Sequence, residues 1–126
     1  MCACMDARRN QVYNGVFLAD GGKLERICQD RAISLEELAN ELEHLDGPIF
    51  LVGDGSGLCY NTLKERLPEL IAPAEHRTHQ RGAGVALAAL KAMERGDSGN
   101  GAALTPNYLR LSQAERERLE RENKGE

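Results

Sequence analysis

The glycine-rich segment from Gly53 to Gly57 is the first place where this sequence could bind a ligand. It reads GDGSG, follows an apolar run typical of a buried strand and precedes a segment with helical character. Phosphate-binding loops lie at such turns, because glycine lets backbone amides approach a phosphate and a helix N-terminus attracts anions. The segment lacks the Lys-Ser/Thr pair of a Walker A loop and the spacing G-x-G-x-x-G. An ordinary strand-to-helix turn is therefore favoured, with a metal- or ATP-binding loop as the alternative.

Two histidines three residues apart, His76 and His79, are the second candidate, with Glu75 beside them. This spacing suits metal coordination when it lies on a helix. The segment follows Pro73 and is strongly polar, which favours an exposed loop or a helix start, and the sequence has no H-E-x-x-H motif. We therefore expect no metal site here.

The four cysteines, Cys2, Cys4, Cys28 and Cys59, include no pair with C-x-x-C spacing. Free thiols in a reducing cytoplasm are the natural interpretation. Cys2 and Cys4 alternate on an expected strand, so both thiols face one side, where buried inert cysteines are more common than a ligand pair. A cysteine nucleophile needs a positioned base, and nothing in the sequence places a histidine beside these thiols. The sequence therefore indicates no catalytic, cofactor-binding or metal-ligating residue.

Five residues are expected to have structural roles: Asp6, Arg8, Tyr13, Tyr108 and Arg110. Asp6 and Arg8, two residues apart where the first strand turns, can brace a hairpin through a charge-assisted hydrogen bond; a carboxylate that binds a cation is the alternative. Tyr108 and Arg110 follow a proline that favours extended backbone. A buried Tyr108 ring would anchor the tail on the domain, and Arg110 would meet a carboxylate or a helix C-terminus.

The elements that position these residues begin with an antiparallel meander. In residues 11–19 the apolar side chains fall alternately on two opposite sides of the chain, with a period of two residues, and this predicts a strand. Asp20-Gly21-Gly22 is a strong turn signal, and we expect strands over residues 1–5 and 23–30 on either side of this strand.

Strand–helix units follow the meander. Ser34 and Glu37 form an S-x-x-E capping box, and leucines at helical spacing up to Leu45 predict a helix. Residues 49–52 are continuously apolar, so we expect a strand buried on both faces and adjacent to residues 1–5. Helices are predicted over 58–67 and 82–95, a short strand over 70–72, an extended segment over 104–111, and a last, charged helix from Ser112.

This order predicts an α/β fold with a mixed sheet, an antiparallel meander followed by strand–helix units. It is the plan of one ribonuclease-H-like half of the actin/hexokinase (ASKHA) fold. We place this domain at residues 1–111 and a charged C-terminal helix or tail at residues 112–126.

The charge of the chain bears on its partners. Its 126 residues carry a net charge of -4, and the basic residues are dispersed or interleaved with glutamate. Proteins that bind nucleic acid by themselves usually carry a basic patch, so we expect no strong direct binding of nucleic acid. No run approaches the roughly 20 apolar residues of a membrane span, so we expect a cytoplasmic protein without a membrane partner.

Two segments near opposite ends of the chain carry a resemblance: MDARRNQVYNGVF, at Met5 to Phe17, and PNYLRLSQAERERLE, at Pro106 to Glu120. The first is similar to the segment that begins the second half of proteins of the TsaB (YeaZ) family, which is glycoprotease-like, and the second is similar to the segment that ends them. The helix SLEELANEL and the strand PIFLVGDG between them are similar in kind. The resemblance spans nearly the whole chain and implies the C-terminal half of the family's two ribonuclease-H-like halves. We expect a fragment without the N-terminal half, which opens with a DTS-type turn.

The resemblance implies a non-catalytic role in making threonylcarbamoyladenosine beside the anticodon of tRNA. The implied partners are TsaD, which binds metal and transfers the threonylcarbamoyl group, and the ATPase TsaE, with the main TsaD contact in the N-terminal half. Two alternatives stay open: a metal- or nucleotide-dependent, peptidase-like enzyme of the same superfold, which would use the turn at Gly53 to Gly57, and a dimerising interaction domain.

Overall fold

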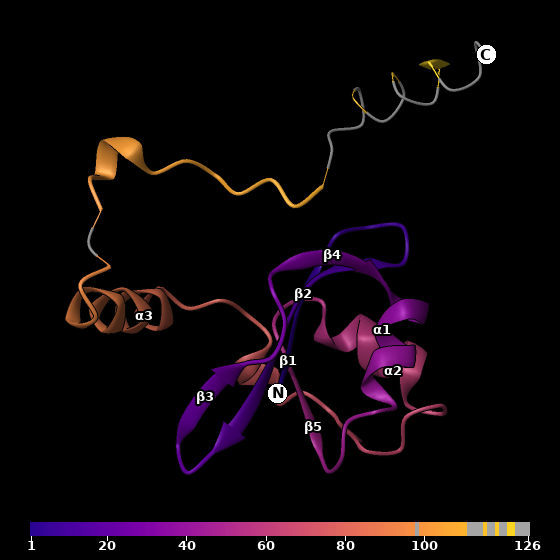
Figure 1. Cartoon of the computed structure of the whole chain (residues 1–126). Coiled ribbons are helices and arrows are strands. Elements are labelled where there is room, and N and C mark those ends of the chain that lie inside the picture. Colours follow the sequence, from indigo (N-terminus) through magenta and orange to yellow (C-terminus); the bar gives the residue numbers. More distant parts are fainter. Residues whose placement is uncertain (98, 111–114, 116–117, 119–120, 123–126) are drawn as a thin grey trace.

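The structure is a computed structural model that describes residues 1–97, 99–110, 115, 118, 121 and 122. Its centre is a mixed sheet with strand order β3-β2-β1-β5-β6, to which β4 is added beside β2. β1 (Cys2–Asp6) is antiparallel to β2 (Gln11–Asp20) and parallel to β5 (Ile49–Val52). β5 is parallel to β6 (Leu70–Ile71). The predicted mixed α/β sheet is thus confirmed (Figure 1).

The long strand β2 is paired along one edge by two short strands. β3 (Lys23–Arg26) pairs with its second half and β4 (Arg31–Ser34) with its first half. The prediction of a single strand over 23–30 was therefore wrong, and β4 was missed. Between the two pairings, the backbone N–H of Val16 donates to the Sγ of Cys28 at 3.3 Å instead of to a carbonyl. This side-chain acceptor interrupts the backbone ladder and separates β3 from β4.

Helix α1 (Leu35–Leu42) begins at the predicted capping box. Ser34 Oγ accepts a hydrogen bond from the Glu37 N–H at 3.2 Å, and Glu37 Oε2 accepts one from the Ser34 N–H at 3.2 Å. Two amides that have no partner within the helix are thereby satisfied. The buried face of the helix includes Leu38 and Leu42, as its leucine spacing predicts.

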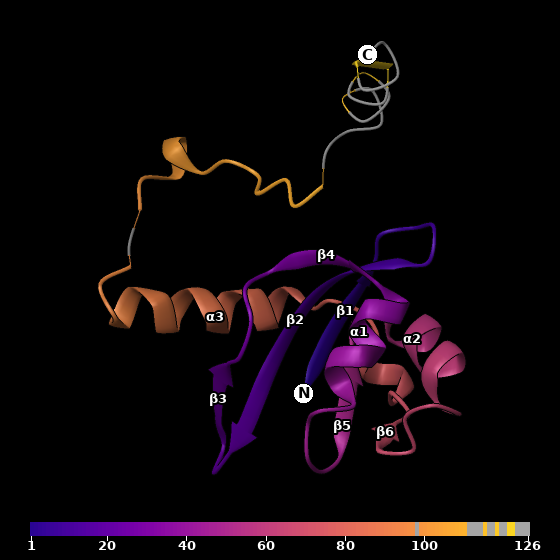
Figure 2. The ribbon, with the colours of Figure 1, turned by 45° about the vertical axis from the view of Figure 1, so that its right-hand side comes forward.

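Helix α2 (Ser56–Leu63) follows β5 and lies on the same face of the sheet as α1 (Figures 1 and 2). It begins two residues earlier and ends four residues earlier than predicted. The core is the layer between these helices and the sheet. Its members include Cys2, Cys4, Val12, Val16, Leu38, Leu42, Ile49, Leu51, Cys59 and Leu63.

The opposite face of the sheet is open. The prediction that residues 1–5 and 49–52 are neighbours is confirmed by the parallel pairing of β1 with β5. The prediction that both strands are covered on both faces was wrong: the side chains of Met5 and Phe50 are 42% and 50% exposed. Their alternating neighbours Cys4 and Leu51 are buried. The reason is that α1 and α2 cover only one face.

Beyond β6 the chain leaves the sheet. It passes through a 3-10 turn, η1 (Glu75–Arg77), into α3 (Gly82–Glu94), close to the predicted helix over 82–95. Figures 1 and 2 place α3 on the side of the sheet opposite α1 and α2. A second 3-10 turn, η2 (Gly101–Ala103), precedes residues 104–110, which return to the domain without regular structure.

The predicted start of a last helix at Ser112 lies outside the described residues, as does the domain boundary that we placed between 111 and 112. Among the helices that the structure describes, none combines the length and the apolar character needed to cross a bilayer.

Candidate functional site

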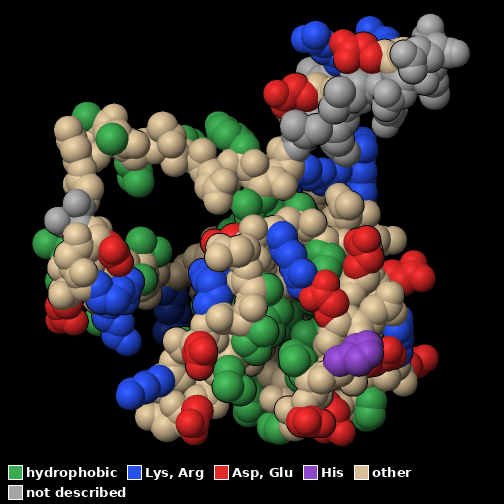
Figure 3. All heavy atoms as spheres, viewed as in Figure 1, with side chains coloured by type: hydrophobic (Ala, Val, Ile, Leu, Met, Phe, Trp, Pro, Cys, Tyr) green, Lys and Arg blue, Asp and Glu red, His purple; other side chains and the backbone are tan. Residues whose placement is uncertain are grey.

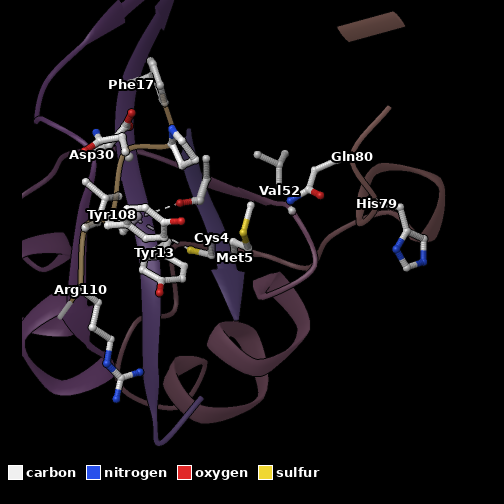
Figure 4. A pocket seen from close by; sticks show the side chains of 17 residues that line it. Cys4, Met5, Tyr13, Phe17, Asp30, Val52, His79, Gln80, Tyr108 and Arg110 are labelled. Carbon is white, nitrogen blue, oxygen red and sulfur yellow. Dashed lines mark hydrogen bonds between the residues drawn. The ribbon is translucent and has the colours of Figure 1, made fainter. Parts of the chain in front are cut away.

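A pocket of about 710 Å³ lies on the open face of the sheet. Its floor consists of β1 and β2 and the end of β5, and one wall is the returning segment Pro106–Arg110, which we call the strap. The residues that line it are Ala3, Cys4, Met5, Tyr13, Asn14, Gly15, Phe17, Asp30, Val52, Gly53, His79, Gln80, Pro106, Asn107, Tyr108, Leu109 and Arg110. Figure 4 shows Tyr13 and Tyr108 in its middle, Asp30 and Phe17 at one end and His79 at the other.

The strap is fastened to the domain by Arg110. Its Nη1 donates a hydrogen bond of 2.5 Å to the carbonyl oxygen of Ala7, at the end of β1. The sequence predicted a carboxylate or a helix C-terminus as the partner of this guanidinium, and the structure instead gives a strand-end carbonyl. The ring of Tyr108 is 84% exposed, so it does not anchor the strap by burial. The structural roles assigned to Tyr13, Tyr108 and Arg110 stay predictions.

Two polar residues that line the pocket, Asp30 and Asn14, have partners within the chain. Asp30 Oδ1 accepts from Arg26 Nη1 at 2.5 Å, and the same guanidinium lies 4.7 Å from the centroid of the Phe17 ring. The buried amide of Asn14 donates to the carbonyl of Ala3 at 3.1 Å. Because these groups are already paired, the surface that the pocket presents to a ligand is mainly apolar. Such a surface suits a protein segment better than a charged metabolite.

The glycine-rich turn after β5 packs against β1. Gly53 has φ +96°, and a Cβ on it would lie 2.2 Å from the carbonyl oxygen of Cys4. The N–H of Gly55 donates to that same oxygen at 3.0 Å, and the N–H of Ser56 donates to Gly53 at 3.1 Å. Two amides that a phosphate loop would direct at its ligand are therefore used inside the chain. This geometry supports the strand-to-helix turn.

The hairpin between β1 and β2 is braced at Asp6. Its Oδ1 accepts from the backbone N–H of Arg8 at 2.7 Å, and its Oδ2 lies 3.5 Å from Arg8 Nη1. Asp6 and Arg8 therefore lie in contact, although the Arg8 side chain is 87% exposed, and the structural roles assigned to these two residues stay predictions. Arg8, Arg9 and Asn10 all have left-handed backbone, with φ 64°, 55° and 56°. The hairpin tip thus carries strain that its sequence did not reveal.

The thiols of Cys2 and Cys4 lie on the buried side of β1, 3.6 Å apart, as their alternation predicts. Hydrogen bonds with the thiols of Cys2 and Cys59, together with burial, raise the pKa of Cys4 above its usual value, whereas the hydrogen bond with Cys4 lowers the pKa of Cys2. Cys2 and Cys4 are 0% and 2% exposed, so neither thiol is accessible to a substrate. No group of three potential ligand side chains that could hold a metal ion occurs among the described residues, and His79 lies at the mouth of the pocket.

The apolar face of the pocket is the part of the site that the sequence did not identify as functional. Tyr13 and Phe17 lie on the side of β2 opposite the buried Val12 and Val16. The sequence of β5 could have revealed the open face, because its residues are apolar on both sides of the strand. Phe50 and Val52 form the side that points away from α1 and α2.

Comparisons with known proteins agree with this fold. The chain is 29% identical over 118 residues to the tRNA threonylcarbamoyladenosine biosynthesis protein TsaB of Bacillus subtilis (strain 168), covering 91% of this chain and 49% of that protein. A Pseudomonas aeruginosa crystal structure, of an uncharacterized protein with similarity to peptidase YEAZ, superposes with a TM-score of 0.51 at 24% identity. It covers 86% of this chain and 48% of that one, and it shows the fold alone.

The structure of YeaZ from Pseudomonas aeruginosa is 23% identical with a TM-score of 0.47, again over 48% of its chain. No protein-family profile matches the sequence. The fold of the chain matches about half of the first of these two structures. The resemblance to TsaB/YeaZ proteins seen in the sequence is thereby borne out as a similarity, and the chain spans about half the length of the proteins that it matches.

Proposed function

We propose that this chain corresponds to the C-terminal half of a TsaB-type protein and supports, without catalysing it, the formation of threonylcarbamoyladenosine in tRNA. The observation that carries this proposal is the similarity over 118 residues to the Bacillus subtilis protein whose name states that biosynthesis. The activity belongs to that whole protein and its partners, and this chain spans about half of its length.

The geometry of the described residues supports a non-catalytic role. The glycine-rich turn uses the amides of Gly55 and Ser56 within the chain. The carboxylate of Asp30 is paired with Arg26, and the thiols of Cys2 and Cys4 are buried away from solvent. A catalytic site of the peptidase or kinase type needs an activated nucleophile, a metal or a phosphate cradle. None of these three arrangements is assembled by the part of the chain that the structure describes.

In this proposal the chemistry is performed by TsaD, with TsaE as a further partner, and the work takes place in the cytoplasm where tRNA is modified. The net charge of -4 favours contacts with protein over direct contacts with tRNA. The open apolar face around Tyr13 and Phe17 supports a role in protein association.

The test is complementation in Bacillus subtilis cells depleted of TsaB, with threonylcarbamoyladenosine in bulk tRNA measured by mass spectrometry. Three strains receive this chain alone, the N-terminal half of TsaB alone, or both. We expect the modified nucleoside to recover only with both. A Leu38→Asp chain, which disrupts the core, serves as the control that recovery needs the folded domain. No recovery with both halves present, or recovery in a purified reaction without TsaD, would contradict the proposal.

A further inference from the structure

Two Asn-Gly dipeptides occur in this chain, Asn14-Gly15 and Asn100-Gly101. Glycine hinders its own backbone nitrogen less than any other residue does, because it has no Cβ and its backbone rotates most freely. In an Asn-Gly pair this nitrogen can therefore attack the side-chain amide carbon of the preceding asparagine. The attack needs rotation of the asparagine backbone, so it depends on how firmly the fold holds each pair.

The first pair is held inside the domain. Asn14 lies on β2, which is paired on both sides at this position, and it is 3% exposed. Its side-chain nitrogen donates hydrogen bonds to the carbonyl oxygen of Ala3 at 3.1 Å and to Cys2 Sγ at 3.2 Å. Rotation of the Asn14 backbone would open the sheet on both sides of β2. The folded chain should therefore protect this pair.

The second pair lies in the segment between α3 and the strap. All residues from 99 to 108 are exposed, and Figures 1 and 3 show this segment apart from the body of the domain. The Oδ1 of Asn100 accepts from the N–H of Ala102 at 3.0 Å, and its carbonyl oxygen accepts from the N–H of Ala103 at 2.9 Å. Rotation of the Asn100 backbone breaks these two local bonds, and water can replace both of them.

We propose that Asn100 is a site of spontaneous deamidation in the folded protein, with water as the co-reactant. The nitrogen of Gly101 loses its proton to hydroxide and forms a bond with Cγ of Asn100. The bond between Cγ and Nδ2 breaks, and Nδ2 leaves as ammonia after it takes a proton from water. Water then opens the resulting cyclic imide at either of its two carbonyl groups. One opening gives aspartate, and the other gives isoaspartate, in which the main chain runs through the former side chain.

The surroundings of Asn100 tolerate both products. Because the position is exposed, the new carboxylate stays in water. The methylene group that isoaspartate adds to the main chain falls in a segment that contributes nothing to the core. The modification therefore lengthens and charges the connection to the strap while the domain stays folded. This inference does not rest on the proposed tRNA function.

The experiment is incubation of the folded full chain in mildly alkaline water enriched in heavy oxygen, followed by tryptic digestion in ordinary water and tandem mass spectrometry. The isotope marks residues modified before digestion, because the water that opens the imide leaves its oxygen in the product. We expect labelled aspartate and isoaspartate at position 100, formed faster as the pH rises, and a much slower reaction at Asn14. Asn107, which is also exposed but precedes Tyr108, should react more slowly than Asn100. In urea, Asn14 should react at a rate comparable to that of Asn100.

Two glycine variants separate the proposed attack from exposure alone. Gly101→Ala should slow the labelling of Asn100 at least about fivefold, because the added methyl group hinders the attacking nitrogen and restricts its backbone. Gly99→Ala is the matched control and should leave the rate unchanged, since a Cβ at either glycine meets nothing within 4 Å. Far-UV circular dichroism confirms that each variant is folded. Equal labelling of Asn14 and Asn100 in the folded chain, aspartate without isoaspartate, or an unchanged rate in Gly101→Ala would each overturn the proposal.

Discussion

The guanidinium of Arg110 donates its hydrogen bond to the carbonyl oxygen of Ala7, a residue 103 positions earlier in the chain. This contact joins the strap to the hairpin that connects β1 and β2.

The first prediction concerns this contact. Arg110→Gln should release the strap and increase proteolytic cleavage within residues 104–110, while the free energy of unfolding of the domain falls by no more than about 1 kcal/mol, because the core does not include the strap. Limited proteolysis with mass spectrometry measures the cleavage. Arg8→Gln is the control, since that side chain is 87% exposed and should leave cleavage unchanged. Equal protection of the parent and Arg110→Gln chains would mean that Arg110 does not hold the strap.

The second prediction concerns the strained hairpin tip. Arg9 has φ 55°, a conformation that costs most residues roughly 1 kcal/mol or more and glycine much less. Arg9→Val should therefore lower the free energy of unfolding by about 1 kcal/mol or more, and Arg9→Gly should leave it unchanged or raise it slightly. Urea denaturation measures both. Glu25→Val on the exposed, extended β3 is the matched control and should be tolerated.

The third prediction contrasts an exposed ring with a buried leucine. The sequence suggested that Tyr108→Ala would cost about 2–4 kcal/mol if the ring were buried. Because the ring is 84% exposed, we now expect a cost of under about 0.5 kcal/mol. Leu38, which is 0% exposed, should cost about 2–5 kcal/mol when changed to alanine. A large loss of stability in Tyr108→Ala, measured by urea denaturation, would show that the ring is buried in solution.

The fourth prediction is a dependence of stability on pH through Glu37. Hydrogen bonds from the hydroxyl and then from the backbone N–H of Ser34 lower the pKa of Glu37 below its ordinary value of 4.5. A carboxyl whose pKa is lowered by folding stabilises the fold above the unfolded pKa, and this contribution is lost as the pH falls through the folded pKa. Stability should thus decline below about pH 4.5, and less steeply in Glu37→Gln. A carboxyl NMR titration of Glu37 that gave the ordinary pKa would contradict the contact.

The fifth prediction is that the chain alone binds tRNA weakly and that added salt weakens the binding further. The net charge of -4 opposes the phosphate backbone, and few cations are available to displace counterions. Fluorescence anisotropy with labelled tRNA over a salt series measures this. A sub-micromolar complex at physiological salt would contradict it.

Local signals in the sequence were enough to predict most elements. The capping box at Ser34 and Glu37 and the adjacency of β1 and β5 were both found as expected. The break between β3 and β4 at Cys28 was not predicted, because it depends on a thiol that accepts a hydrogen bond from the N–H of Val16 on the neighbouring strand. The exposure of Met5 and Phe50 was missed for a related reason. An apolar residue shows that a surface should be covered, but it does not show whether this chain supplies the cover.

The two edges of the sheet bear on how the chain avoids aggregation. One edge is shared by β3 and β4, which have four residues each. β3 has the sequence KLER and all four of its residues are exposed, so charged side chains flank its unpaired backbone groups. At the other edge, β6 has only two residues. Charged or very short edge strands are poor templates for strand addition. Addition of strands from other copies of the chain, which is the route to fibrils, is therefore disfavoured at both edges of the sheet. This holds although one face of the sheet is apolar and exposed.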